Sequence, residues 1–311
     1  MPGGASREAS HERHLSVANV KRASRQRHLG VTRVKKRHMG VIWGVTRGGA
    51  CRYHLGPVVP SGAPQVLAVV PARGGSKGIP RKNLQLLAGR PLVVHAVDAG
   101  LGASRVTRVV CSTDDPDIAE VARAAGADVP FLRPSDLAQD SSEDWPVFVH
   151  VLNWLEQHEN WRPDLIVNLR PTSPMRTPRH VDAAIELLLE TGADSVKAVC
   201  LARQHPHKMW LRHSDGRIEP YLKTPFRLSR GPDVPRAELE DVYWQNGVVD
   251  VTRREVIQER GVMIGARVAG LVTKPEESID IDTPLDLAMA ELLYARRVSA
   301  AQQMGGPGRT P

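Results

Sequence analysis

The chain has 311 residues, with 42 lysine and arginine against 34 aspartate and glutamate side chains, and a formal net charge of +8. Residues 1–64 hold 12 of the basic and 2 of the acidic side chains, an excess of 12 − 2 = +10, which leaves 8 − 10 = −2 for the rest. The positive charge therefore belongs to the first segment and does not indicate a nucleic-acid-binding core.

No apolar run approaches the length of a membrane span, and the three cysteines (Cys51, Cys111 and Cys200) form no CxxC pair. Both features favour a cytoplasmic protein with reduced thiols.

Residues 1–64 form a basic arm in which an Arg-His pair followed by leucine or methionine recurs as a loose repeat. The arm has too few large apolar side chains to build a core, so we expect it to be disordered, like the tail at residues 299–311. Its composition also suits a transit peptide or contact with RNA. The simplest interpretation is that translation begins further along and that the folded domain spans residues 65–298.

Short apolar runs alternate with longer amphipathic ones from residue 65 onward, which is the pattern of βαβ units in an open, mostly parallel sheet. We expect an α/β, Rossmann-like domain whose ligand-binding loops gather at one edge of the sheet. Residues 204–240, rich in proline, arginine and histidine, interrupt this pattern. The predicted strands are 66–70, 106–110, 165–169 and 196–201, and the predicted helices are 92–102, 118–125, 147–156 and 181–189.

A glycine-rich loop directly follows the first predicted strand, within VLAVVPARGGSKGIPRKN at residues 66–83. Its glycines let the backbone approach a ligand closely and turn N–H groups toward it. The loop matches neither the Walker A nor the dinucleotide GxGxxG motif, and phosphate is the anion we expect it to bind. The alternative is a basic loop that simply lies in solvent. The cationic side chains of the turn are Arg73, Lys77, Arg81 and Lys82.

Two aspartates near the end of the domain, Asp280 and Asp282 in ESIDIDTPLD, are predicted to bind a metal ion. They are two residues apart in an extended segment, so their side chains project to the same face. Adjacent carboxylates repel unless a cation lies between them, and Mg²⁺ is typically held by one or two carboxylates together with phosphate oxygens and water. The alternative, which is compatible with metal binding, is that Asp282 caps a helix while Asp280 is exposed.

Four segments, PARGGSKGIPRKN, LRPTSPMRT, RAELEDVYWQNG and SIDIDT, follow one another in the order seen in acylneuraminate cytidylyltransferases, the CMP-sugar synthetases. On these motifs the chain resembles that family from about Val66 to Arg297. The resemblance implies that an acidic acceptor attacks the α-phosphate of CTP and that pyrophosphate leaves. It also implies a homodimer, with contacts mediated by the excursion at residues 204–240.

The resemblance further implies that the glycine-rich loop holds the triphosphate of CTP. Arg73 and Lys77 would act in catalysis by stabilising charge as pyrophosphate leaves. Asp282 is the third predicted catalytic residue, since with Asp280 it would hold Mg²⁺. The other nucleotide-binding residues predicted in the loop are Gly75, Ser76, Lys82 and Asn83.

Two further loops are expected to face the nucleotide. In CSTDD, Ser112 and Asp114 are predicted nucleotide ligands, although Thr113 or Asp115 is equally suited to cap the following helix. In LRPSDLAQD, Arg133 is predicted to contact the base or the ribose.

The acceptor pocket is implied by the family pattern R-x-x-L-x-x-x-[aromatic]-x-x-N-G, which Arg236, Tyr243 and Asn246 meet. Arg236 would bind the acceptor carboxylate, and Lys208 in HPHK would add a second cation. The alternative for Lys208 is an exposed lysine in a loop.

Arg170 precedes a PTSP segment whose Thr172 and Ser173 are also predicted to bind the acceptor. Relatives that act on sialic acid tend to have glutamine in place of Arg170, so this cation suggests an acceptor with more negative charge. Two acceptors are therefore open, a nonulosonic acid of the sialic type and a small phosphonate such as phosphonoformate. Alternatively, Arg170 pairs with a nearby acid and leaves the sugar specificity unchanged. A non-catalytic nucleotide-binding protein is the alternative of another class, but it would be expected to lack these cations and aspartates.

Overall fold

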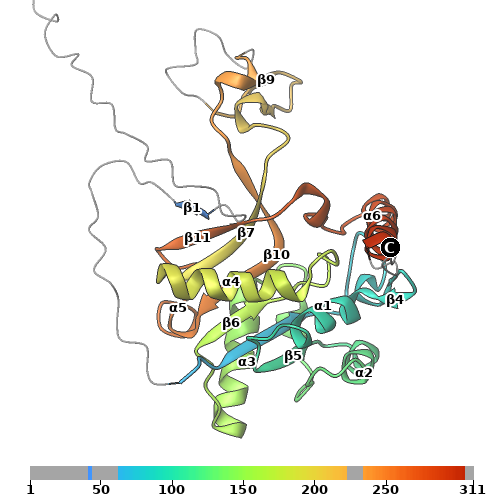
Figure 1. The fold of residues 1–311 in the computed structure, drawn as a ribbon, viewed down its shortest axis with the longest axis vertical. Coiled ribbons are helices and arrows are strands. Elements are labelled where there is room, and N and C mark those ends of the chain that lie inside the picture. The colour runs from blue at the N-terminus through green and yellow to red at the C-terminus, as the bar shows by residue number, and fades with distance from the viewer. Residues whose placement is uncertain (1–40, 44–61, 223–233, 305–311) are drawn as a thin grey trace, which may run out of the picture. The chain divides into compact units, whose positions relative to one another are not determined.

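The computed structural model describes residues 41–43, 62–222 and 234–304. Predictions for the remainder of the arm and for residues 305–311 lie outside the described residues. A seven-stranded sheet with the order β1-β11-β7-β10-β6-β2-β5 organises the described chain (Figure 1). Its strands are β1 (Val41–Trp43), β2 (Val66–Pro71), β5 (Arg108–Ser112), β6 (Leu165–Asn168), β7 (Ser195–Leu201), β10 (Tyr243–Arg253) and β11 (Val268–Val272).

The sheet is mixed but mostly parallel. Strand β2 pairs in parallel with β5 and β6, and β11 pairs in parallel with β7. Strand β10 lies antiparallel between β6 and β7, and β1 lies antiparallel to β11. The predicted α/β, Rossmann-like architecture is therefore confirmed, with a reversed strand inserted in the sheet. Two small hairpins accompany it, formed by β3 (Leu86–Leu87) with β4 (Arg90–Pro91) and by β8 (Trp210–Arg212) with β9 (Ile218–Pro220).

The helices begin where the sequence supplies capping groups. The Asp115 carboxylate accepts hydrogen bonds from the backbone N–H groups of Asp117 and Ile118, which confirms its predicted role as a helix cap. Thr177 forms a capping box with His180 at the start of another helix. The helices are α1 (Leu92–Leu101), α2 (Pro116–Ala124), α3 (Asp144–Glu159), α4 (Pro178–Thr191), α5 (Arg254–Gln258) and α6 (Pro284–Met304).

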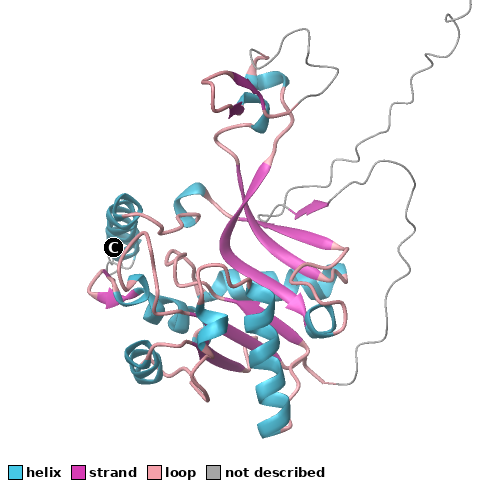
Figure 2. Cartoon of the chain, turned by 180° about the vertical axis from the view of Figure 1, so that it is seen from behind, coloured by secondary structure: helices cyan, strands magenta, loops and turns pink. Residues whose placement is uncertain are grey.

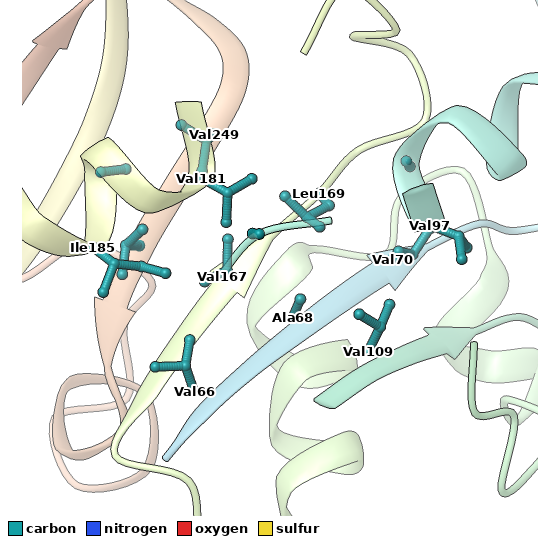
Figure 3. Close-up of a cluster of buried hydrophobic side chains, with 14 of the residues drawn as sticks. Val66, Ala68, Val70, Val97, Val109, Val167, Leu169, Val181, Ile185 and Val249 are labelled. Atoms are coloured by element: carbon teal, nitrogen blue, oxygen red, sulfur yellow. The ribbon is translucent and has the colours of Figure 1, made fainter. Parts of the chain in front are cut away.

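Both faces of the sheet are covered by helices, which explains why β2 reads as a continuous apolar run. Val66, Ala68 and Val70 of β2 belong to a cluster with residues of α1, α2 and α4 (Figure 3). Leu67 and Val69 point to the opposite face and pack with α3 and α5. The helices α1 and α4 lie in front of the sheet in Figure 1, and α3 lies in front of it in the opposite view of Figure 2. The central strands are thereby shielded from water, and their carboxyl ends hold the loops that carry polar groups.

A third apolar cluster anchors the segment that carries the predicted metal ligands. Ile281 is fully buried with Ile79, Leu87 and Ala290, from the glycine-rich loop, β3 and α6. Its backbone N–H donates to the Thr172 carbonyl over 2.8 Å. Because side chains alternate in an extended segment, the buried Ile281 directs its two aspartate neighbours away from this cluster.

The two ends of the domain differ from the sequence prediction. The arm was expected to be disordered, yet residues 41–43 form β1, because the edge of β11 offers unpaired backbone groups. The tail from residue 299 was expected to be disordered, yet α6 continues to Met304 through alanine and glutamine, which are good helix formers.

Cys111 and Cys200 are both buried, as predicted for core residues. Burial raises the pKa of the Cys111 thiol to about 12, so it is not a reactive thiolate. Across the described residues, no helix is long and apolar enough to cross a membrane.

Candidate active site

A cavity of about 230 Å³ lies at the carboxyl ends of β2 and β6, the edge where open α/β sheets bind ligands. It brings together residues from the glycine-rich loop, the Arg133 segment and the PTSP segment, which are far apart in the sequence. Its polar lining residues are Arg73, Ser76, Lys82, Asn83, Arg133, Gln139, Asp140, Ser142, Asp144, Arg170 and Thr172. Seven of these eleven residues are sequence-predicted site residues, so the structure gathers both predicted nucleotide and predicted acceptor groups around one space.

The glycine-rich loop is held by its neighbours. The Gly74 N–H donates to the Asp114 carboxylate over 3.0 Å, and the Asn83 side chain donates to the Arg73 carbonyl over 2.8 Å. A Cβ atom at Gly78 would lie 2.2 Å from the carbonyl oxygen of Asp282, so only glycine allows this approach between the two segments. Asp114 was predicted to contact the nucleotide, whereas here it positions the loop.

Asp140 bridges the two cations predicted to stabilise the leaving group. Its carboxylate oxygens lie 2.7 Å from Arg73 Nη1 and 2.6 Å from Lys77 Nζ. The hydrogen bond from Lys77, followed by that from Arg73, lowers the pKa of Asp140 below its usual value. The carboxylate thus occupies both cations that the sequence predicts to bind phosphate.

Arg133 is a buried cation at the cavity wall. Its Nε donates to the Ser112 hydroxyl over 3.1 Å, and its Nη2 donates to the Ser112 carbonyl. Burial lowers the pKa of Arg133 from its usual value, although the charge of Asp114 opposes this effect. Ser112 is itself fully buried, so the predicted nucleotide ligand acts here as the support that orients Arg133.

Asp280 and Asp282 are adjacent to the cavity and differ in their surroundings. Asp282 is largely exposed and its Oδ1 lies 2.9 Å from Lys82 Nζ. The carboxyl of Asp280 has a raised pKa, because surrounding atoms partly desolvate it and because Asp282 repels its charge. The Thr172 hydroxyl bonds to Asp280 and opposes that rise.

This pair fits Mg²⁺ only as a partial site. No group of three or more histidine, cysteine, aspartate or glutamate side chains in the described ranges is arranged to hold a metal ion. Two carboxylates on one face nevertheless match the coordination preference of Mg²⁺, which binds few protein ligands and completes its octahedral coordination with phosphate oxygens and water. Mutual repulsion between the two carboxylates is the property that a divalent cation would relieve.

Arg170 forms an ion pair with Asp144, and both residues line the cavity. Burial disfavours the charge of Arg170, yet the carboxylates of Asp144, Asp250 and Asp280 raise its pKa above the usual value. The structure therefore bears out the pairing of Arg170 with a nearby acid, whereas an unchanged sugar specificity stays a prediction.

Two predicted acceptor ligands do not reach the cavity. Asn246 is buried, and its side chain donates to the hydroxyls of Thr273 and Ser278 over 2.6 and 2.8 Å. Its oxygen accepts from the backbone N–H of Val248. Ser173 is also fully buried. Neither side chain lines the cavity in this structure, so contact of Asn246 and Ser173 with an acceptor stays a prediction.

Three other predicted acceptor residues lie in or beside the excursion. Arg236 lines a small second cavity of about 20 Å³ and donates to the Ala202 carbonyl over 3.2 Å. Lys208 ends a short 3-10 helix, and Tyr243 pairs with Leu201 where β10 begins. Among the described residues, none from the excursion lines the larger cavity, so contact of these side chains with an acceptor stays a prediction.

Sequence reasoning missed Asp140 and Asp144, which both line the cavity and pair with predicted site cations. A weak signal was present, since LRPSDLAQD ends with Asp140 and precedes the helix that begins at Asp144. Only the fold shows which cations these carboxylates meet.

The fold and the cavity define an α/β protein with a polar site at the carboxyl edge of its sheet. A family model described as cytidylyltransferase matches residues 67–299. The chain belongs to the cytidylyltransferase family, which makes it a nucleotidyltransferase enzyme.

Named relatives agree with this assignment. The chain is 35% identical over 233 residues to CMP-N,N'-diacetyllegionaminic acid synthase of Legionella pneumophila, which covers 74% of this chain and 96% of the relative. It is 34% identical over 226 residues to N-acylneuraminate cytidylyltransferase A of Danio rerio, covering 73% of this chain. The match spans 50% of that longer relative, so only half of the fish protein has a counterpart here.

A solved structure confirms the fold. CMP:2-keto-3-deoxy-manno-octonic acid synthetase, complexed with CTP, superposes with a TM-score of 0.55 and covers 75% of this chain and 99% of its own. At 19% sequence identity, this likeness concerns the architecture alone.

We predict that Gly78→Ala separates the glycine-rich loop from the Asp282 segment, because the added methyl group meets a backbone oxygen that cannot rotate away. The expected cost is about 1–3 kcal/mol of unfolding free energy, together with weaker binding of inorganic tripolyphosphate. Gly75→Ala is the matched control, since nothing lies within 4 Å of a Cβ at that position. Denaturant unfolding and calorimetry measure both effects, and equal behaviour of the two variants would contradict the prediction.

We predict that Asp140→Asn strengthens binding of inorganic tripolyphosphate about threefold. In the wild type the Asp140 carboxylate must be displaced from Arg73 and Lys77 before phosphate binds them, and the variant lacks this competing negative charge. Asp136→Asn, which removes a charge from an exposed position of the same segment, serves as the control. Calorimetric titration at two salt concentrations is the measurement. Weaker binding in Asp140→Asn would show instead that this carboxylate preorganises the cations.

We predict that Asn246→Ala destabilises the fold rather than the binding of an acceptor. Loss of its three hydrogen bonds leaves buried polar groups unpaired and is expected to cost about 2–3 kcal/mol. Denaturant unfolding compares it with Asn153→Ala on the exposed side of α3. Wild-type stability in Asn246→Ala would refute the structural assignment.

Proposed function

We propose that this enzyme transfers CMP from CTP to a nonulosonic acid and releases pyrophosphate. An acceptor hydroxyl oxygen forms a bond to the α-phosphorus, the bond from that phosphorus to the bridging oxygen of pyrophosphate breaks, and the hydroxyl proton leaves to solvent or a base. The observation that carries the proposal is the single cavity that joins Arg73, Ser76 and Lys82 to Arg170 and Thr172. The named relatives, which make CMP-activated legionaminic and acylneuraminic acids, support the choice of acceptor.

The protein supplies position and charge rather than covalent chemistry. The cations Arg73 and Lys77 suit the developing charge of pyrophosphate, and the backbone of the glycine-rich loop allows close approach of the phosphates. Arg133, fixed by Ser112, supplies a rigid donor at the nucleotide end of the cavity. Water exclusion and orientation of the two substrates then account for most of the rate enhancement expected of such a site.

Magnesium belongs to the proposal. Asp280 and Asp282 would hold it, and bound Mg²⁺ would neutralise phosphate charge near the attacked phosphorus. Lys82, which pairs with Asp282 here, would then be available to the phosphates. Burial is the main cause of the raised pKa of Asp280, and repulsion from Asp282 adds to it; a divalent cation would relieve that repulsion.

The phosphonate alternative finds less support. A dianionic acceptor calls for an unpaired guanidinium, whereas Arg170 is already paired with Asp144. A monocarboxylate sugar is recognised mainly through its hydroxyl and N-acyl groups, so it does not require an unpaired positive charge at Arg170.

A homodimer is the assembly we propose. The excursion and the strand ends that lead into it expose large apolar side chains, which monomeric proteins rarely gather on one segment. These side chains are Met209, Trp210, Leu211, Ile218, Tyr243 and Trp244.

Pyrophosphate release from CTP and Mg²⁺ tests the function, with N,N'-diacetyllegionaminic acid, N-acetylneuraminic acid and phosphonoformate offered separately. We expect turnover with a sugar acid. Turnover with phosphonoformate alone would replace the acceptor, and CTP binding without turnover of any acceptor would favour the non-catalytic alternative.

We predict that Asp282→Ala lowers turnover by about a hundredfold or more, because a Mg²⁺ ligand is lost. Stability should change by less than about 1 kcal/mol, since the side chain is mostly exposed. Glu276→Gln, at an exposed position in the preceding segment, controls for loss of one charge. Full activity of Asp282→Ala in the pyrophosphate assay would remove the metal assignment.

A further inference from the structure

Arg170 is held through both its backbone and its guanidinium. Its backbone carbonyl accepts a hydrogen bond over 2.7 Å from Nη2 of the buried Arg176. A Cβ atom at Gly247, where φ is +68°, would lie 3.8 Å from Arg170 Nη1 and 3.2 Å from Ser173 Oγ. The backbone at Gly247 therefore borders the guanidinium at ordinary contact distance. The side chain is held beside the cavity and retains about a third of its exposure, 34%.

Asp144 completes this arrangement from another element. It is the first residue of α3, where the positive end of the helix dipole stabilises a carboxylate. The indole of the next residue, Trp145, donates to the Ile257 carbonyl over 2.8 Å and fixes the start of the helix against α5. The carboxylate therefore meets Arg170 from a rigid support rather than from a mobile loop.

Charges are distributed unequally along the cavity. Its lining contains Arg133, whose direct partners are Ser112 and the Leu137 carbonyl, and Arg170, which is paired with the Asp144 carboxylate. Arg170 therefore offers N–H donors within a pair that has no net charge, whereas the direct hydrogen-bond partners of Arg133 are uncharged and leave its positive charge in place.

We propose that Asp144 is a positioning residue that sets acceptor specificity by holding and neutralising Arg170. This inference rests on the proposed function and adds to it the class of group that Arg170 accepts. The group is an uncharged hydroxyl or N-acyl substituent of a sugar acid, not a phosphonate dianion. A dianion would meet the Asp144 carboxylate beside the guanidinium and would have to displace it.

Asp144→Asn in the full chain tests the proposal, because it keeps the shape of the side chain and removes its charge. Glu143→Gln is the matched control, since it removes the same charge at the neighbouring exposed position, where the side chain makes no capping hydrogen bond. With CTP and Mg²⁺, we expect KM for the sugar acid to rise about fivefold in Asp144→Asn, with a smaller change in kcat and no change in KM for CTP. The effect should disappear in an Arg170→Gln background, which a merely structural role for Asp144 would not produce.

A second measurement requires no turnover. The enzyme is saturated with Mg²⁺ and α,β-methylene-CTP, so that the phosphate-binding loop is filled, and is then titrated with phosphonoformate. We expect Asp144→Asn to bind phosphonoformate about fivefold more tightly than the wild type, and Glu143→Gln to bind it like the wild type.

The outcomes separate this inference from the proposed function. If the wild type turns over a sugar acid but Asp144→Asn behaves like Glu143→Gln in both measurements, the inference is overturned and the function stands. If the wild type turns over no sugar acid, the function fails. The titration alone then decides on Asp144: tighter phosphonoformate binding in Asp144→Asn supports its control of Arg170, and equal binding overturns it.

Discussion

Pairing between unlike charges at the carboxyl edge of the sheet is the interaction on which the rest of the site depends. Cations from separate segments converge there, and they would repel one another without nearby carboxylates. The pairs are Arg73 and Lys77 with Asp140, Lys82 with Asp282, and Arg170 with Asp144. Each pair also joins two segments, so the ionic contacts fix the relative positions of loops that have little apolar packing. On the proposed function, substrate binding would be an exchange of partners, in which phosphate would replace a carboxylate and a metal ion would replace an ammonium group.

The fold makes this convergence possible by covering both faces of the sheet and leaving one edge for polar groups. The apolar contacts of Ile281 and the close backbone approach at Gly78 bring the C-terminal aspartates beside a loop about 200 positions earlier in the chain. Buried hydrogen bonds of Asn246 tie the same region to β10 and to the residues that follow β11. Geometry at the site is therefore secured by core packing, and ionic pairs make the final adjustment.

Local patterns predicted the part of the fold that depends on local structure. The strand β2 and the cap at Asp115 could be predicted from the sequence. A buried strand shows as a continuous run of apolar residues, and a cap shows as an aspartate directly before a helix. Strand β10 was not predicted, since its shift in register around Gly247 and its polar start obscure the alternation of a strand. The glycine-rich loop was found through its composition, whereas Asp140 and Asp144 are single acids whose partners only tertiary structure brings close. Asn246 shows the opposite case, because its place in a motif was visible but its burial was not.

The ion pairs also differ in how readily they exchange partners. Lys77 is 80% exposed, so its pairing with Asp140 is screened by water and contributes little to stability. A triphosphate with several negative charges can displace that carboxylate at small cost. Arg170 is 34% exposed and meets an acid fixed at the start of a helix, which makes its pairing more persistent. Arg73 is 32% exposed and thus as shielded as Arg170, so the Arg170 pair is set apart by the helix that carries its acid rather than by burial. On the proposed function, an acid held in this way suits recognition of the uncharged part of an acceptor by its shape and hydrogen bonds.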